Sequence, residues 1–287
     1  TGPTGVGKTE ATLRLAEHFG VPVINADSRQ IFAEIPIGTA APTAAQQARV
    51  RHYFVGNHHL EDYYSASLFE EDVLKLINES SSKVSLLSGG SMMYIDAVCK
   101  GIDDIPTIRP EVRQEMMQLL EKEGLAKMCE LLHEWDPEHW AVVDRNNPRR
   151  VIHALEICKQ TGRTYTSFRS NTIKERPFNI IKIGLNRDRD TLYQRINQRV
   201  LQMIDDGMIE EAQRVYPKRM LNTVGYKELF EYLDGLTTLD EAIFKIQSNT
   251  RRYARKQLTW YKRDQEMTWF SPDNIEEILN CLYTISL

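Results

Sequence analysis

The 287-residue chain has no long apolar run and no leader-like start. No stretch approaches the roughly 20 consecutive apolar residues that are needed to span a bilayer. The first residues also lack a basic segment followed by a short apolar stretch and a cleavage site. We therefore expect a soluble, cytoplasmic protein that does not associate with a membrane.

Cysteine is scarce, and its spacing excludes the common metal and redox sites. There is no Cys-x-x-Cys pair and no Cys/His spacing suited to zinc. We interpret all four cysteines as small core residues: Cys99, Cys129, Cys158 and Cys281. The net charge of −4 argues weakly against nucleic acid as a partner, but the basic residues are unevenly distributed, and distribution matters more than the sum.

A phosphate-binding loop opens the chain. Residues 2–9 fit the pattern G-x-x-x-x-G-K-[ST] at every fixed position, and a helical pattern follows directly. Glycines let successive backbone N–H groups face one concavity, and the helix N-terminus adds partial positive charge. Lys8 is expected to reach terminal phosphate oxygens, and the Thr9 hydroxyl to ligate Mg²⁺. The residues predicted to bind the diphosphate of a ligand are Gly2, Thr4, Gly5, Val6, Gly7, Lys8 and Thr9.

Apolar periodicity predicts an α/β fold, with a P-loop NTPase-like parallel sheet as its core. We expect helices over residues 8–19 and 65–80 and short buried strands over 21–26 and 83–87. The order helix, strand, helix, strand implies a parallel sheet that is covered by helices on both faces.

A helical insertion interrupts this core. Consecutive helical patterns run from about residue 108 to 166, and one helix starts at Asn147-Pro148, where Asn caps and Pro suits the first turn. A strand returns over 179–185, and Thr238-x-x-Glu241 predicts a capping box that opens a long helix to about Lys262. We predict a core of residues 1–107 and 177–287 with a helical C-terminal part, and an insertion of residues 108–176.

The residues that follow two of the strands narrow the chemistry. The strand ending at Leu87 is followed by Ser-Gly-Gly-Ser, without the carboxylate that a nucleotide hydrolase uses to organise its metal, so ATP hydrolysis is not expected. Asp27 follows the other strand, at the edge where open α/β sheets gather their ligands. From position alone, a turn or cap role for Asp27 is as consistent as a catalytic role.

Seven short motifs are spread over almost the whole chain, at residues 2–9, 27–32, 37–40, 89–94, 147–150, 224–228 and 254–260. Their sequences and order resemble the tRNA dimethylallyltransferase (tRNA isopentenyltransferase) family. Seven dispersed motifs are far more specific than one phosphate loop. Ser91 stands where the family usually has Thr. Residues 216–222 form a shorter connection than is usual, either because the loop is shortened or because residues are missing from the sequence. The absence of the C-terminal zinc finger of many eukaryotic members favours the bacterial type.

The resemblance implies transfer of a dimethylallyl group from dimethylallyl diphosphate to the exocyclic amine of the adenosine 3′-adjacent to the anticodon in tRNA, with release of diphosphate. The loop, Lys8 and Mg²⁺ near Thr9 would neutralise charge on the leaving group. Asp27 would accept the proton of the attacking amine. Ser91 would help to orient the reacting groups, although it is also suited to cap the helix that follows.

The resemblance also implies a macromolecular partner, the tRNA anticodon stem-loop, which a monomer binds without protein partners. The target base must be extruded from its stack, and Ser28 and Gln30 are suited to read its edge. Six cations follow one helix at spacings that align Arg251, Arg255 and Lys262. Composition alone would favour a solvated surface for them, and the motif favours phosphate binding. The residues predicted to contact tRNA are Asp27, Ser28, Arg29, Gln30, Ser91, Arg113, Arg149, Arg150, His153, Arg252, Arg255, Lys256 and Gln257.

Two other functions remain open at this stage. A P-loop enzyme that acts on a small molecule, such as an AMP isopentenyltransferase or a nucleotide kinase, would share the loop but would need neither the insertion nor the basic helix. A non-catalytic nucleotide-binding module that docks on RNA would leave the Asp27 motif unexplained.

Overall fold

A computed structural model of the chain describes residues 1–170, 172–218, 221 and 223–286. Two compact units are present: the first joins Thr1–Lys100 to Arg176–Leu287, and the second is Gly101–Glu175. The insertion predicted from the sequence, residues 108–176, therefore starts seven residues after the second unit starts and ends one residue after that unit ends. No described helix is both long and apolar enough to cross a membrane.

Parallel strands form the centre of the first unit. β1 (Val23–Asn25) pairs with β2 (His52–Tyr53) on one side and with β3 (Leu86–Ser88) on the other. A second parallel pair joins β4 (Ile183–Leu185) to β5 (Thr268–Phe270). Thr1 lies alongside β4, because its amino group donates to Ile183 O at 2.7 Å and its carbonyl accepts from Leu185 N at 2.8 Å.

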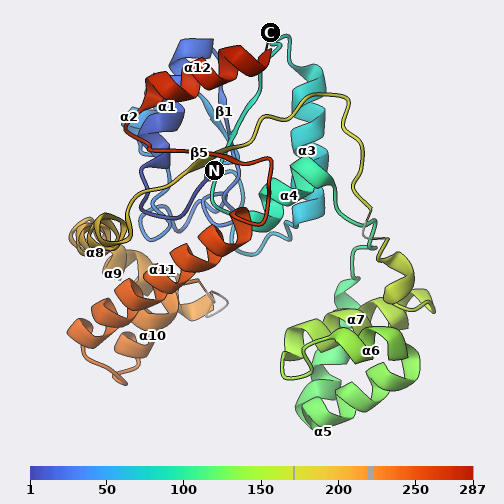
Figure 1. The fold of residues 1–287 in the computed structure, drawn as a ribbon. Helices are drawn as coiled ribbons and strands as arrows, with labels where there is room; N and C mark the ends of the chain where they lie inside the picture. The colour runs from blue at the N-terminus through green and yellow to red at the C-terminus, as the bar shows by residue number, and fades with distance from the viewer. Residues whose placement is uncertain (171, 219–220, 222, 287) are drawn as a thin grey trace. The chain divides into compact units, whose positions relative to one another are not determined.

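Helices cover both faces of β1, as the sequence predicts. α1 (Lys8–Phe19) packs Leu13 and Ala16 against Val23. On the other face, α3 (Ala66–Glu79) and α4 (Met92–Lys100) pack Phe69, Val73 and Tyr94 against Ile24. Figure 1 shows α1 on one side of the sheet and α3 with α4 on the other. The predicted α/β class with a parallel sheet is confirmed.

The predicted helix boundaries are accurate where local capping signals exist. α1 ends at Gly20, whose φ of 62° is the left-handed conformation that favours glycine. α7 (Pro148–Thr161) starts after Asn147, whose side chain accepts from Arg150 N. α11 (Leu239–Tyr261) starts with the predicted capping box of Thr238 and Glu241.

The strand boundaries are less accurate. The run predicted over 21–26 is a strand only from Val23 to Asn25, and the runs over 83–87 and 179–185 become Leu86–Ser88 and Ile183–Leu185. β2, β5 and the short helix α2 (Ala44–Arg49) are absent from the prediction. A buried parallel strand is a plain apolar run, so its ends depend on pairing that the sequence does not display.

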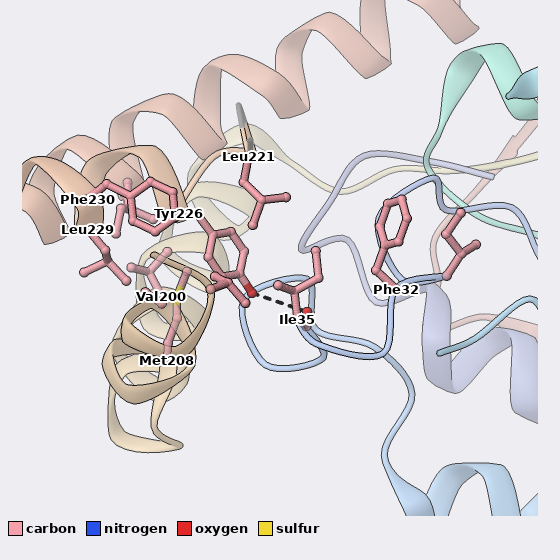
Figure 2. Packing of buried hydrophobic residues seen from close by; sticks show 12 residues of the cluster. Phe32, Ile35, Val200, Met208, Leu221, Tyr226, Leu229 and Phe230 are labelled. Carbon is pink, nitrogen blue, oxygen red and sulfur yellow. Dashed lines mark hydrogen bonds between the residues drawn. The ribbon is translucent and has the colours of Figure 1, made fainter. Parts of the chain in front are cut away.

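The helices after β4 form a layer of their own in the first unit. α8 (Arg189–Asp205), α9 (Met208–Val215), α10 (Tyr226–Leu233) and α11 pack together, α12 (Ile275–Ser286) lies beside α1, and a short 3₁₀ turn (Tyr216–Lys218) follows α9. Their shared core includes Val200, Met208, Tyr226 and Leu229, and it extends to Ile35 in the segment after β1 (Figure 2). The predicted shortening of residues 216–222 concerns positions 219, 220 and 222, which lie outside the described residues.

The second unit is wholly helical in its regular elements. α5 (Pro110–Trp135), α6 (Pro137–Val142), α7 and a 3₁₀ turn (Thr166–Phe168) surround a core that includes Met128, Leu132, Val151 and Leu155. Gly124 breaks the regular helix within α5 with a φ of 78°. The unit therefore has its own hydrophobic core, as an inserted domain requires.

Candidate active site

The phosphate loop depends on glycine backbone geometry. Gly5 and Gly7 adopt φ values of 81° and 109°, which side chains other than glycine rarely tolerate. A Cβ on Gly2 would lie 2.6 Å from the carbonyl oxygen of Leu185 in β4. α1 begins directly after Gly7, so its free N–H groups and partial positive charge face the loop.

Two arginines brace this loop through its carbonyl groups. Arg187 Nε donates to Val6 O at 2.8 Å, while both of its terminal nitrogens bind the Asp273 carboxylate at 2.5 Å. Arg195 Nε donates to Gly5 O at 3.0 Å. Neither residue was predicted as part of the site, because these contacts join segments more than 180 residues apart.

Gln257 braces the loop from the helix α11. Its Oε1 accepts from Thr4 N at 2.8 Å, and its Nε2 donates to Gly90 O at 2.8 Å. Gln257 is 2% exposed, and protein groups bind both ends of its amide. Gln257 thus ties the phosphate loop to the loop after β3, and its predicted contact with tRNA stays a prediction.

Lys8 points back across its own loop. Its Nζ donates to Gly2 O at 3.0 Å and to Pro3 O at 2.9 Å. Burial, and after it the charge of Arg199, lower the pKa of Lys8 to about 8, while the Asp27 carboxylate raises it. An ammonium group that is poorly solvated in this way gains strongly from a bound anion.

Arg199 on α8 supplies a second cation beside the loop. Its Nη1 donates to Thr4 Oγ1 at 3.4 Å, and burial lowers the pKa of its guanidinium, against the charge of Asp27. Arg199 was not predicted as a site residue, because an arginine in an amphipathic helix usually lies on a solvated face. The one available signal is its spacing, since Arg195 and Arg199 are four residues apart and share a helix face.

Asp27 lies at the carboxyl end of β1, as predicted, and forms a tight turn. Its Oδ1 accepts from Arg29 N at 2.9 Å and Gln30 N at 3.4 Å. Its charge acts on both Lys8 and Arg199. The turn role that the sequence left open is therefore present, and the catalytic role stays a prediction.

Ser91, in the segment between β3 and α4, holds the Asp27 turn. Its Oγ accepts from Ser28 N at 2.8 Å and donates to Ser28 Oγ at 3.1 Å, and Ser91 N donates to Ala26 O at 3.1 Å. Ser91 is 7% exposed. Its hydroxyl therefore orders the turn through Ser28, and because Ser91 also lines the cavity, its predicted contact with tRNA stays a prediction.

Gln30 lines the cavity and uses its amide nitrogen within the protein, so its predicted reading of a base edge stays a prediction. Its Nε2 donates to Thr39 O and to Ala40 O, both at 3.0 Å. The amide protons are thus used to fix the segment of residues 37–40, which lines the site. Ser28 and Arg29 remain at the cavity wall, where they were predicted.

A buried carboxylate anchors the same segment from the other side. Glu211 of α9 is fully buried and accepts from Ile37 N and Gly38 N, each at 2.8 Å, and from the Tyr226 hydroxyl. A Cβ on Gly38 would overlap the Tyr226 hydroxyl. In Figure 2 the Tyr226 hydroxyl points toward Ile35, to whose carbonyl it also donates. These contacts explain why the motifs at residues 37–40 and 224–228 occur together.

Asp27, Lys8, Ser91, Arg199 and Gln257 line one cavity of about 850 Å³ within the first unit. This volume is typical of small-molecule sites. The phosphate loop, Asp27 and Arg199 line it together with the apolar side chains Ile196, Val200, Met203, Met208, Val224 and Ile246. The lining therefore suits a ligand that combines an anionic group with a small apolar group.

The donor set around Thr9 bears on the predicted Mg²⁺. Thr9 follows Lys8 in the first turn of α1, is exposed and lines the cavity. Across the described residues, no group of three or more His, Cys, Asp or Glu could hold a metal ion. A single hydroxyl fits a Mg²⁺ ion that arrives on a diphosphate, because Mg²⁺ usually keeps several waters and takes its other ligands from substrate phosphates.

The cations of α11 fall into two groups. Arg251 Nη1 binds Asn197 at 2.5 Å, and Arg255 Nη1 donates to the Tyr193 hydroxyl at 2.9 Å, so both reach toward α8. Arg252 and Lys256 are exposed, and Arg252 makes a 3.3 Å contact with Asn249.

The predicted cations of the insertion lie on α5 and α7. Arg113 Nε and His153 Nδ1 lie 3.5 and 3.6 Å from the buried carboxylate of Glu156. Arg149 and Arg150 are exposed in the first turn of α7. Cations at a helix N-terminus oppose the helix dipole, so helix stability does not explain this pair.

Comparison with known proteins identifies the relatives of the chain. A family model described as "IPP transferase" matches residues 30–264. A protein from Parabacteroides distasonis named "tRNA dimethylallyltransferase 2" is 60% identical over 98% of this chain and 96% of its own length. The crystal structure of a tRNA isopentenylpyrophosphate transferase from Bacillus halodurans is 35% identical and covers 99% of this chain and 94% of its own, with a TM-score of 0.70. A corresponding Staphylococcus epidermidis structure is 27% identical over 99% of this chain and 97% of its own, with a TM-score of 0.68.

Proposed function

The chain belongs to the IPP transferase family, and from this premise we propose that it transfers a dimethylallyl group from dimethylallyl diphosphate to the exocyclic amine of the adenosine 3′-adjacent to the anticodon in tRNA. The observation that carries the proposal is one cavity in which Lys8 and Arg199 at the phosphate loop share the lining with the Asp27 carboxylate. Two relatives that match the chain are named as tRNA dimethylallyltransferases, which supports the transfer of a dimethylallyl group to tRNA.

The phosphate loop serves the leaving group. As the allylic carbon–oxygen bond breaks, negative charge grows on the departing diphosphate. That charge is stabilised by the loop N–H groups, the N-terminus of α1 and the ammonium of Lys8. The guanidinium of Arg199 stabilises it further. When bound on the diphosphate beside Thr9, Mg²⁺ supplies further charge neutralisation.

Asp27 serves the nucleophile. The exocyclic nitrogen of adenine forms a bond to the allylic carbon and must lose one proton, which the Asp27 carboxylate accepts. The backbone N–H groups of Arg29 and Gln30 hold Oδ1 in place. Ser91 binds Ser28, the residue after Asp27, so the Asp27 carboxylate keeps its direction during the reaction.

Transfer RNA binds to basic residues of α11 and of the insertion. The target base must leave its stack to enter the cavity. Arg252, Arg255 and Lys256 on α11, and the insertion residues Arg113, Arg149, Arg150 and His153, bind phosphates of the anticodon stem-loop. The proposed enzyme acts as a monomer in the cytoplasm, where its tRNA substrate is found.

Nucleoside mass spectrometry tests this function. Unmodified tRNA or AMP is incubated with dimethylallyl diphosphate, Mg²⁺ and the protein, and the nucleosides are analysed. We expect one dimethylallyl-adenosine per tRNA and no product from AMP. Product from AMP alone would favour the small-molecule transferase, and RNA binding without any product would favour the non-catalytic module.

A further inference from the structure

An adenine that leaves the anticodon loop loses its stacking neighbours. Enzymes that extrude a base recover this free energy with aromatic or apolar side chains in the site. Of the described residues that line the cavity, Tyr253 is the only Phe, Tyr or Trp. Tyr253 is 37% exposed, so its ring has open surface on which a ligand could lie.

The helix α11 directs this ring into the site. Ile246, Thr250, Tyr253 and Gln257 are spaced by four, three and four residues, so they share one face of the helix, and all four line the cavity. Gln257 binds the phosphate loop at Thr4 N. Tyr253 therefore lies one turn, about 6 Å along the helix, from a fixed contact with that loop.

The polar surroundings of Tyr253 join it to the nucleophile side of the site. The Asp27 carboxylate and the Arg29 guanidinium both act on the Tyr253 hydroxyl. Burial first, and the charge of Asp27 second, raise the pKa of this hydroxyl to about 12, so it stays protonated at neutral pH. Tyr253 is therefore not expected to accept a proton in the reaction. It offers a flat ring in the same cavity as the group that receives the amine proton.

We propose that Tyr253 stacks on the extruded adenine and holds its exocyclic amine toward Asp27. The proposal rests on the proposed function and assigns the base-binding surface of the same site. Arg252 and Lys256 flank the ring in sequence, so one turn of α11 contributes both the stacking surface and phosphate contacts.

A double-mutant cycle in binding tests the stacking contact. The dissociation constant is measured for two anticodon stem-loops, one with adenine and one with an abasic sugar at the target position. Both are bound to the unaltered protein and to the Tyr253→Leu variant, without dimethylallyl diphosphate. We expect the unaltered protein to prefer the adenine loop about 5- to 100-fold, as stacking on an aromatic ring should give, and the Leu variant to retain less than about a fifth of that preference.

Two further variants make the result specific. Tyr253→Phe keeps the ring and should keep the preference within about twofold. Phe244→Leu removes a ring from the opposite face of α11, where Phe244 is 66% exposed and outside the cavity lining, and should leave the preference unchanged. Equal preferences in the unaltered protein and Tyr253→Leu would overturn the proposal. So would a Tyr253→Leu variant that loses affinity for dimethylallyl diphosphate alone, because the ring would then serve the isoprenoid. Product formation from intact tRNA by the unaltered protein reports separately on the proposed function.

Discussion

The wall of the cavity and the cationic surfaces differ in how their side chains are held. In the cavity, Asp27, Lys8 and Gln257 each bind backbone atoms at defined distances. On the surfaces, Arg252, Lys256 and the Arg149–Arg150 pair are exposed.

This difference matches two physical tasks. Stabilising a leaving group and accepting a proton require groups that are already oriented when charge develops. Attraction to a phosphate backbone works through longer-range charge and tolerates mobile side chains. Changes in the cavity should therefore alter the rate of transfer, and changes on the surfaces should alter tRNA affinity and its salt dependence.

The largest effect is expected at Asp27. Asp27→Ala should lower turnover by at least about a hundredfold, because a positioned general base is lost. Binding of tRNA should survive, since the surface cations are unchanged. Steady-state transfer to tRNA and a binding assay measure the two effects. Normal turnover in this variant would remove Asp27 from the mechanism.

A smaller but clear effect is expected at Gln257. Gln257→Glu should raise the dissociation constant for dimethylallyl diphosphate by about tenfold or more. A carboxylate oxygen would then face Gly90 O and would add negative charge beside the phosphate loop. Gln247→Glu makes the same change on the same helix outside the cavity lining and should have little effect. Equal responses of the two variants would argue against a bracing role.

The lowered pKa of Lys8 leads us to expect that diphosphate binding depends on pH. Its pKa of about 8 means that the cation is present below pH 8 and is lost as the pH rises further. Affinity should therefore be nearly constant up to pH 8 and then fall by up to about tenfold per pH unit. Calorimetry from pH 7 to 9.5 measures this. Lys8→Arg stays charged, so an equal fall in that variant would assign the dependence to another group.

The smallest effect on turnover is expected on the outer surface of α11. Changing Arg252, Arg255 and Lys256 to Gln should weaken tRNA binding and flatten its salt dependence by up to about three units of slope. Turnover at saturating tRNA should barely change. The loss should be similar for cognate and non-cognate tRNAs, because phosphate contacts carry no base information. As a control, Lys75→Gln with Lys83→Gln removes two exposed cations outside the cavity lining. If the salt dependence of tRNA binding is unchanged in the triple variant, these three residues do not contact tRNA phosphates.

Local sequence signals predicted what depends on local geometry. Gly20, Asn147 and the Thr238–Glu241 pair act within one turn of the helices that they delimit, so those boundaries were predicted correctly. β2 has only two residues and owes its existence to pairing with β1, so no periodicity reveals it.

The same contrast divides the candidate site. The phosphate loop and Asp27 were visible because the loop is a contiguous motif and the aspartate follows a strand. Arg187, Arg199 and Glu211 were not predicted, since each acts on a segment more than 170 residues away. Gln30 and Gln257 were recognised as parts of motifs, but the sequence does not show where their amide groups point. Hydrogen bonds to carbonyl groups elsewhere in the chain set that direction.

A single-turnover experiment tests most directly the division between an organised cavity and a cationic surface. The rate of transfer is measured at saturating tRNA and saturating dimethylallyl diphosphate for the unaltered protein, for Asp27→Asn and for the triple Gln variant of α11. The rate should fall by at least about a hundredfold in Asp27→Asn, whereas the triple variant should remain within about threefold of the unaltered protein, as expected when only phosphate contacts are lost. Comparable losses in the two variants, or an unchanged rate in Asp27→Asn, would contradict the account.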